Sequence, residues 1–114
     1  MTEILDKRTT ENVWYDFDCT NLLNAAETIQ SITSITADQS GLTFGTPVIN
    51  TAVITYPDNT TAAIGKVARC QIGGGIIPAG ATEMFYTVRV LMTTNDGGNI
   101  REATTLLRII NNAT

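Results

Sequence analysis

Two carboxylates, Asp16 and Asp18, are the side chains whose types and spacing come closest to those of a chemical site. Residues i and i+2 of a strand project from the same face, so both carboxylates would point the same way. Such a pair can serve as the acid and base of a glycosidase, or ligate Ca²⁺, which takes about six to eight oxygen ligands. No loop rich in Asp or Asn accompanies the pair, so the favoured interpretation is a solvated strand face.

Other groups that carry chemistry are scarce. The sequence has no histidine, which removes the usual general base and the commonest metal ligand. Its two cysteines, Cys19 and Cys70, cannot complete a structural zinc site alone, because such sites need four ligands. The first residues show no secretion signal, so we expect both thiols to be free and to act as small buried hydrophobic side chains. We therefore predict no enzymatic activity, no metal, no cofactor and no small-molecule substrate.

Trp14 is the residue with the clearest potential for recognition, because the surrounding pattern places it on the polar face of a strand. An exposed indole can stack on a sugar or anchor a contact between proteins. It can equally pack beneath the N-terminal segment or beneath a corner formed by residues 21–27. The sequence leaves these possibilities open.

The elements that position these side chains are expected to be strands, because β-branched residues dominate the composition. The chain contains 20 Thr, 13 Ile and 6 Val among 114 residues, whereas charged residues make up only 16%. β-branched side chains lose rotamer freedom in helices and pack well on a pleated surface. We therefore expect an all-β fold and, at this length, one domain.

Alternating apolar residues mark the individual strands. Residues 13–20 and 86–93 alternate with period two, and Asn95-Asp-Gly-Gly98 offers a tight hairpin that returns through residues 100–110. Four further strands are expected at residues 28–36, 42–45, 48–56 and 62–72. About seven short strands, with turn signals every ~8–12 residues, fit an Ig-like antiparallel β-sandwich.

The N-terminal segment differs from the rest of the chain. Residues 1–12 are polar and aperiodic, which predicts a polar N-terminal arm before a single β-sandwich domain at residues 13–114. The net charge of −4 divides into −5 over residues 1–38 (seven acids, two bases) and +1 over residues 39–114 (four acids, five bases). So few bases disfavour nucleic-acid binding, and no apolar stretch approaches a membrane span. The acidic segment beside a near-neutral body could favour head-to-tail contact between identical copies.

The last expected strand, residues 100–110, is apolar on both faces. Leu107 and Ile109 would face the core, while Leu106 and Ile110 would point outward. A monomer would leave the outward pair partly exposed to water. Burying it would stabilise the protein by about 25 cal/mol for each Å² of apolar surface. We therefore expect another subunit to cover the outer side of this hairpin.

The beginning, middle and end of the chain together resemble a group of small phage proteins. The motifs are Asp6-Lys-Arg-Thr-Thr-Glu-Asn-Val-Trp-Tyr-Asp-Phe-Asp18 with Leu22, Leu23 and Glu27-Thr-Ile29; Ser40-Gly-Leu-Thr43; and Gly73-Gly, Tyr86-Thr-Val-Arg-Val, Thr93-Thr-Asn-Asp-Gly97 and Leu107-Arg-Ile109. Over nearly the whole chain, their order is similar to that of the fiber–tail adaptor family, Ig-like virion proteins of tailed bacteriophages. The family has no catalytic residues, so the resemblance implies a structural role.

The function implied by the resemblance is that of a virion adaptor, repeated around a ring, that joins tail or connector to fiber. Its expected partners are other virion proteins and copies of itself, and its expected location is the virion tail, after synthesis in the bacterial host cytoplasm. A related alternative is a head–tail connector or capsid decoration protein. An alternative from another class is a carbohydrate- or surface-binding Ig-like module. The residues expected to make protein contacts are Asp6, Lys7, Arg8, Trp14, Leu106 and Ile110.

Overall fold

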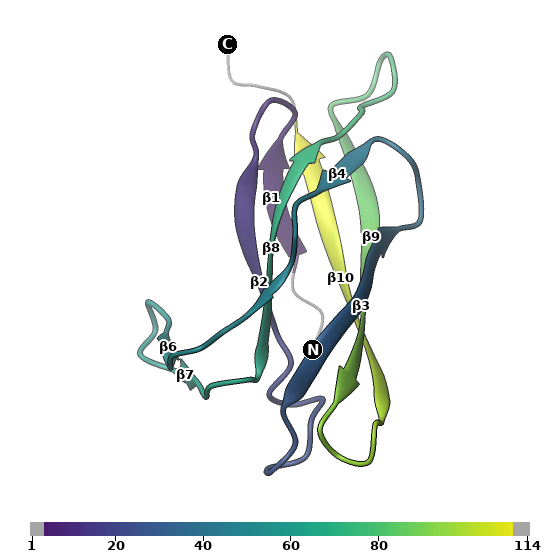
Figure 1. Cartoon of the computed structure of the whole chain (residues 1–114). Coiled ribbons are helices and arrows are strands. Elements are labelled where there is room, and N and C mark those ends of the chain that lie inside the picture. Colours follow the sequence, from purple (N-terminus) through teal and green to yellow (C-terminus); the bar gives the residue numbers. More distant parts are fainter. Residues whose placement is uncertain (1–3, 111–114) are drawn as a thin grey trace.

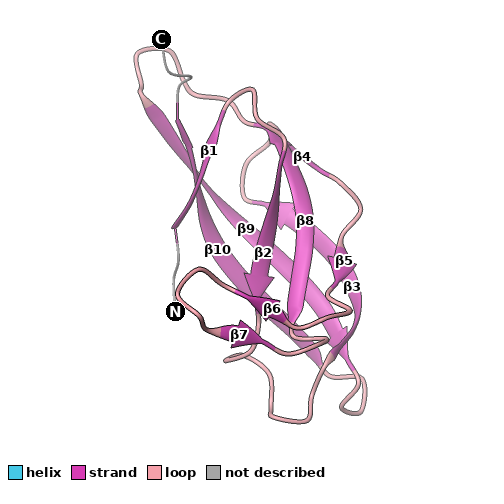
Figure 2. Ribbon diagram, turned by 90° about the vertical axis from the view of Figure 1, so that its left-hand side faces the viewer, coloured by secondary structure: helices cyan, strands magenta, loops and turns pink. Residues whose placement is uncertain are grey.

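The computed structural model describes residues 4–110, which form two facing β-sheets and no helix (Figures 1 and 2). The ten strands in this range are β1 (Ile4–Arg8), β2 (Val13–Asp18), β3 (Ile29–Ala37), β4 (Leu42–Phe44), β5 (Val48–Ile49), β6 (Ile54–Thr55), β7 (Thr61–Ala62), β8 (Val67–Gly74), β9 (Glu83–Thr94) and β10 (Ile100–Ile110). Three of them, β5, β6 and β7, are only two residues long. The other seven, with the short β5, build the sandwich, which confirms the predicted all-β, Ig-like fold of about seven strands.

The first sheet combines strands from both ends of the chain, and the second is built from strands between them. The first sheet has the strand order β1-β10-β9-β3, and the second has the order β2-β8-β4, with β5 also paired to β8. The chain begins in the first sheet, where β1 runs parallel to β10, and then enters the second, where β2 runs antiparallel to β8. β6 and β7 form a separate small hairpin that projects to one side of the sandwich in Figure 1.

Alternation along β9 shows how the sequence builds the core. Its even-numbered residues from Tyr86 to Met92 are at most 1% exposed, because β9 lies inside the first sheet and turns this face toward the second. The other buried apolar residues of the main core are Tyr15, Phe17, Cys19, Leu23, Ile29, Ala68, Cys70, Ile72, Leu107 and Ile109. The two predicted period-two strands, at residues 13–20 and 86–93, therefore supply half of these core residues.

The prediction of an N-terminal arm is wrong for residues 4–8, which form β1. Ile4 pairs with Leu106 and Arg8 with Ile110, in parallel register. A polar sequence can still complete a sheet, because the ladder uses backbone hydrogen bonds that need no apolar side-chain pattern. Leu5 also packs against the core. The domain therefore begins before the predicted boundary at residue 13, and residues 1–3 and 111–114 lie outside the described range.

The predicted strand at residues 48–56 is wrong in its middle, where the chain turns around Asn50. The buried Asn50 amide donates to the carbonyls of Ala52 and Ala63, both at 2.9 Å. Its oxygen accepts from the backbone N–H groups of Gly65 and Val67, both at 3.0 Å. These four bonds draw the flanking segments together, so only the two-residue strands β5 and β6 remain.

β3 is bulged where it pairs with β9. β3 pairs with β9 with register shifts between Ile29 and Ser31 and between Ile32 and Ser34. The shifts keep Ile29, Ile32 and Ile35 in contact with the core although their spacing departs from period two.

Candidate functional site

Four of the predicted contact residues meet where β1 pairs with β10. Asp6 lies opposite Arg108 and accepts two hydrogen bonds from its guanidinium, at 2.8 and 2.9 Å. This contact lowers the pKa of Asp6. Arg8 lies opposite Ile110, and Ile4 lies opposite Leu106. The predicted sites Asp6, Arg8, Leu106 and Ile110 therefore share one region, although about a hundred residues separate them in sequence.

Lys7, also predicted as a contact residue, points the other way. Its side chain is only 1% exposed, and its ammonium donates to the carbonyl oxygens of Arg8 and Gly74. Burial lowers the pKa of Lys7. Lys7 ties β1 to the end of β8 in the other sheet, so its inclusion among surface contact residues is wrong.

The outward side of the first sheet forms a mixed apolar and polar surface, called here the β9–β10 face. It comprises the outward residues Phe85, Thr87, Arg89, Leu91, Glu102, Thr104, Leu106, Arg108 and Ile110. Phe85 is 41% exposed and lies opposite Arg108, while Leu106 and Ile110 are half-buried. The expectation that apolar residues lie on this outer side is confirmed, and its coverage by another subunit stays a prediction.

Trp14 lies on the other sheet, apart from the other predicted residues. It is 50% exposed on the outward side of β2, opposite Gln71 of β8. It borders an open groove of about 590 Å³, called here the Trp14 groove. The groove is lined by Leu5, Trp14, Tyr15, Asp16, Asp18, Tyr56, Pro57, Asp58, Thr60 and Arg69. Trp14 therefore lies on the outward face of its strand, as predicted, and of the alternatives left open by the sequence the structure shows the exposed one.

Carboxylates dominate the polar lining of the Trp14 groove. Asp16 accepts a hydrogen bond from Arg69 at 2.7 Å, across the β2–β8 pair. Asp58 accepts from the backbone N–H and hydroxyl of Thr60 at 3.0 and 2.6 Å, and these bonds lower its pKa. With Asp18, the lining holds three carboxylates and one guanidinium. The groove therefore offers an aromatic surface beside a net negative charge.

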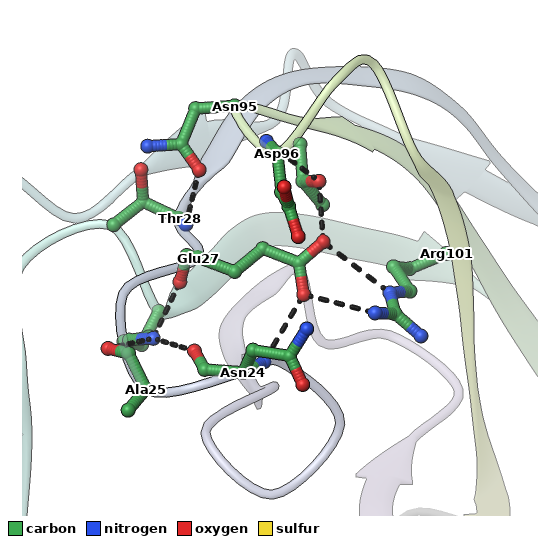
Figure 3. Close-up of polar contacts among 9 residues, drawn as sticks. Asn24, Ala25, Glu27, Thr28, Asn95, Asp96 and Arg101 are labelled. Carbon is green, nitrogen blue, oxygen red and sulfur yellow. Dashed lines mark hydrogen bonds and ion pairs between the residues drawn. The ribbon is translucent and has the colours of Figure 1, made fainter.

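A second polar cluster lies at the end of the sandwich (Figure 3). Here the segment that links β2 to β3, residues 19–28, meets the β9–β10 hairpin, and this segment is called here the 19–28 corner. The buried Glu27 carboxylate accepts from the Thr94 hydroxyl at 2.5 Å, from the Asn24 backbone N–H at 3.0 Å, and from Arg101 at 3.1 Å. The Thr94 bond and the other two donors lower the pKa of Glu27 to about 2. The cluster thus keeps Glu27 ionised and its acceptors occupied, as in a structural anchor.

Lys66 completes this cluster, and it is a functional side chain that the sequence analysis missed. Its ammonium donates to the carbonyl oxygens of Asn24 at 2.8 Å and Ala25 at 3.1 Å, and also to that of Glu27. The residue is buried, although a lysine is ordinarily exposed. One feature of the sequence could have indicated the burial of Lys66. Residues 21–27 form a corner without regular structure, and the carbonyl groups of such a corner need donors from elsewhere in the chain.

Both cysteines are free and buried, as predicted. Burial raises the pKa of the Cys19 thiol to about 11, and burial also raises that of Cys70. The Cys19 thiol donates to the Phe17 carbonyl at 3.4 Å, and the Cys70 thiol to the Gly45 carbonyl at 3.4 Å. Neither thiol is activated as a nucleophile.

Residues 4–110 contain neither a cluster of potential metal ligands nor a membrane-spanning helix. No group of three or more His, Cys, Asp or Glu side chains in this range is arranged to hold a metal ion. The same range contains no helix that is long and apolar enough to cross a membrane.

Comparisons with known proteins identify no family for this chain. No protein-family model matches the chain, and no curated protein matches it. The chain is similar to a solved structure, that of mouse clustered PcdhgC3 EC1-3, with 14% sequence identity and a TM-score of 0.40. The match covers 97% of this chain but 31% of that one, so this chain spans about a third of its length. A likeness this distant does not bear on function.

Proposed function

We propose that this chain is a structural protein of a tailed-bacteriophage virion, an adaptor that joins tail or connector to fiber through contacts with other proteins and with its own copies. The resemblance of its terminal motifs to the fiber–tail adaptor family supports this role. The proposed role needs no catalysis and no cofactor. Its site of action is the virion tail, after synthesis in the bacterial host cytoplasm.

One structural observation carries the proposal: β1 and β10 pair, which gathers four of the six predicted contact residues, Asp6, Arg8, Leu106 and Ile110, at the β9–β10 face and its edge. Phe85 and Ile100 leave apolar surface exposed on the two strands of this face, at 41% and 68%. Aromatic and arginine side chains are enriched in the contacts that dominate protein interfaces. Phe85 opposite Arg108 has that composition. A head–tail connector or capsid decoration protein would use the same face.

A second candidate function, binding to a carbohydrate or another surface, is favoured by the Trp14 groove. The half-exposed indole offers a flat apolar surface, and the Asp16–Arg69 pair offers both acceptors and donors for hydroxyl groups. This combination suits a neutral sugar.

The experiment that tests the adaptor role uses phage particles encoded by DNA that carries this gene. We expect antibodies against the chain to label the tail in electron micrographs, and deletion of the gene to yield particles without fibers. The wild-type chain should restore fibers. The control Val53→Asp should restore them too, because Val53 is an apolar residue at least as exposed as Phe85 but lies away from the β9–β10 face. Phe85→Asp should not. Fully fibered particles that lack the chain would contradict the proposal.

A further inference from the structure

Arg89 stands apart from the other basic side chains of the molecule. Lys7 and Lys66 are buried against carbonyl oxygens. Each remaining arginine except Arg89 also has a partner within the chain: Arg69 with Asp16, Arg101 with Glu27, Arg108 with Asp6, and Arg8 with an interaction of its own. Within residues 4–110, Arg89 has neither an ion pair nor a side-chain hydrogen bond. Its guanidinium is therefore available to a partner.

The position of Arg89 suits an interface anchor. It is exposed near the middle of β9, an inner strand of the first sheet, between Thr104 of β10 and Thr36 of β3. Both threonines are exposed and short, so the longer guanidinium stands above them. Glu102 lies diagonally beside Arg89 on the same face without an ion pair between them. Residues that dominate binding energy cluster near the centre of an interface and are enriched in arginine.

The Trp14 groove has the complementary chemistry. Its three carboxylates against one guanidinium give the lining a formal charge of −2. The carboxylate of Asp16 already has Arg69 as its cation, whereas those of Asp18 and Asp58 accept only from neutral threonine groups in the described range. The half-exposed indole of Trp14 adds a face that attracts a cation. A guanidinium suits the negative charge of the lining, the carboxylates that lack a cation and the indole face better than a neutral or anionic group does.

We propose that the Trp14 groove of one copy binds Arg89 of a second copy, so that the β9–β10 face of each molecule seats on the outer side of β2 of the next. This inference rests on the proposed function, because it names the contact by which copies of the adaptor associate. Arg89 points outward from the first sheet and Trp14 points outward from the second, so the two anchors lie on opposite outer sides of the sandwich. The contact is therefore head-to-tail, and repeated copies form a ring when the rotation closes.

The experiment uses the full chain and two variants with opposite defects. Arg89→Glu removes the cation but leaves the groove intact, and Trp14→Lys blocks the groove but leaves Arg89 intact. Ile64→Lys and Val53→Glu are matched controls, since both residues are at least as exposed as Trp14 and neither lines the groove. Circular dichroism checks that each variant folds. Sedimentation velocity over a concentration series then measures the association of each protein alone and of the two defective variants mixed.

The head-to-tail contact makes a specific prediction for the mixture. Each defective variant alone should associate more than about thirtyfold more weakly than wild type, the loss expected for an anchor residue. Mixed together, they should form a 1:1 dimer that grows no further, because only one intact groove and one intact Arg89 can meet. The two controls should associate like wild type.

Four other outcomes would overturn this contact. If both defective variants associate like wild type, the contact is wrong, while the adaptor role stands on its separate test with particles. If each is monomeric but the mixture forms no dimer, or if wild type itself is monomeric throughout, the groove does not hold Arg89. The groove is a carbohydrate-binding site instead if wild type binds neutral oligosaccharides, Trp14→Lys does not bind them, and the two proteins self-associate equally.

Discussion

At the residue scale, the molecule uses buried charges to hold irregular backbone. Lys66 satisfies three carbonyl oxygens of the 19–28 corner, and Glu27 satisfies the Asn24 N–H from inside the same corner (Figure 3). Buried polar groups of this kind stabilise a fold only while every donor and acceptor is matched. The cluster therefore makes the corner sensitive to protonation and to single substitutions.

The stability of the fold should depend on the ionisation of Glu27. Its pKa is lowered from 4.5 to about 2, so its contribution is complete above its unfolded-state pKa and is lost as the pH falls through about 2. We expect the free energy of unfolding to fall more steeply between those pH values in wild type than in Glu27→Gln. Urea denaturation along a pH series measures both slopes. Equal slopes would contradict the assignment.

The two thiols should be unreactive in the folded protein. Cys19 and Cys70 are buried, and the pKa of Cys19 is raised to about 11, so almost no thiolate forms at neutral pH. Treatment with an aromatic disulfide reagent should modify neither cysteine in the native state and both after denaturation. Rapid modification of the native protein would show that the second sheet opens around β8.

At the element scale, β1 makes the N-terminal segment part of the sandwich rather than an arm outside it. It pairs along five residues of β10 and places Leu5 against the core. Its charged residues Asp6, Lys7 and Arg8 lie at an edge of the first sheet, and charges at an edge strand discourage pairing with foreign strands. β1 thus contributes both to stability and to the surface proposed for assembly.

Lys7→Met should destabilise the fold, because the carbonyl oxygen of Gly74 then loses its donor inside the sandwich. Leaving a buried acceptor unsatisfied costs about 1–3 kcal/mol. Chemical denaturation should show this loss as a lower midpoint with an unchanged slope. Asp6→Asn, on the same strand but exposed, serves as the control and should change the midpoint little. No difference between the two variants would mean that Lys7 does not tie β1 to β8.

The sequence was sufficient to predict the strands whose side-chain pattern decides their burial. β9 and β10 alternate clearly around a glycine-containing turn, and Trp14 falls on the outward side of β2. β1 could not be predicted in this way, since its pairing depends on backbone bonds to a strand about a hundred residues away. The same limit applies to the Trp14 groove, because Tyr56 and Asp58 reach it from a hairpin distant in sequence.

At the scale of the whole molecule, the sandwich is elongated, with extents of 47 × 29 × 23 Å, and presents two unlike outer faces. The β9–β10 face carries Phe85 and Arg89, whereas the outer side of β2 carries Trp14 beside carboxylates. Unlike faces on opposite sides favour head-to-tail association, in which each copy uses one face toward each neighbour. That geometry suits a component repeated around a tail.

Native mass spectrometry of the purified full chain shows whether this protein is a self-associating structural component. We expect one closed oligomer with a single discrete copy number at high protein concentration, in equilibrium with monomer on dilution. Phe85→Asp should shift the population to monomer, while Ile64→Asp, at a comparably exposed apolar residue outside both faces, should not. A protein that stays monomeric at every concentration would overturn the proposed self-association.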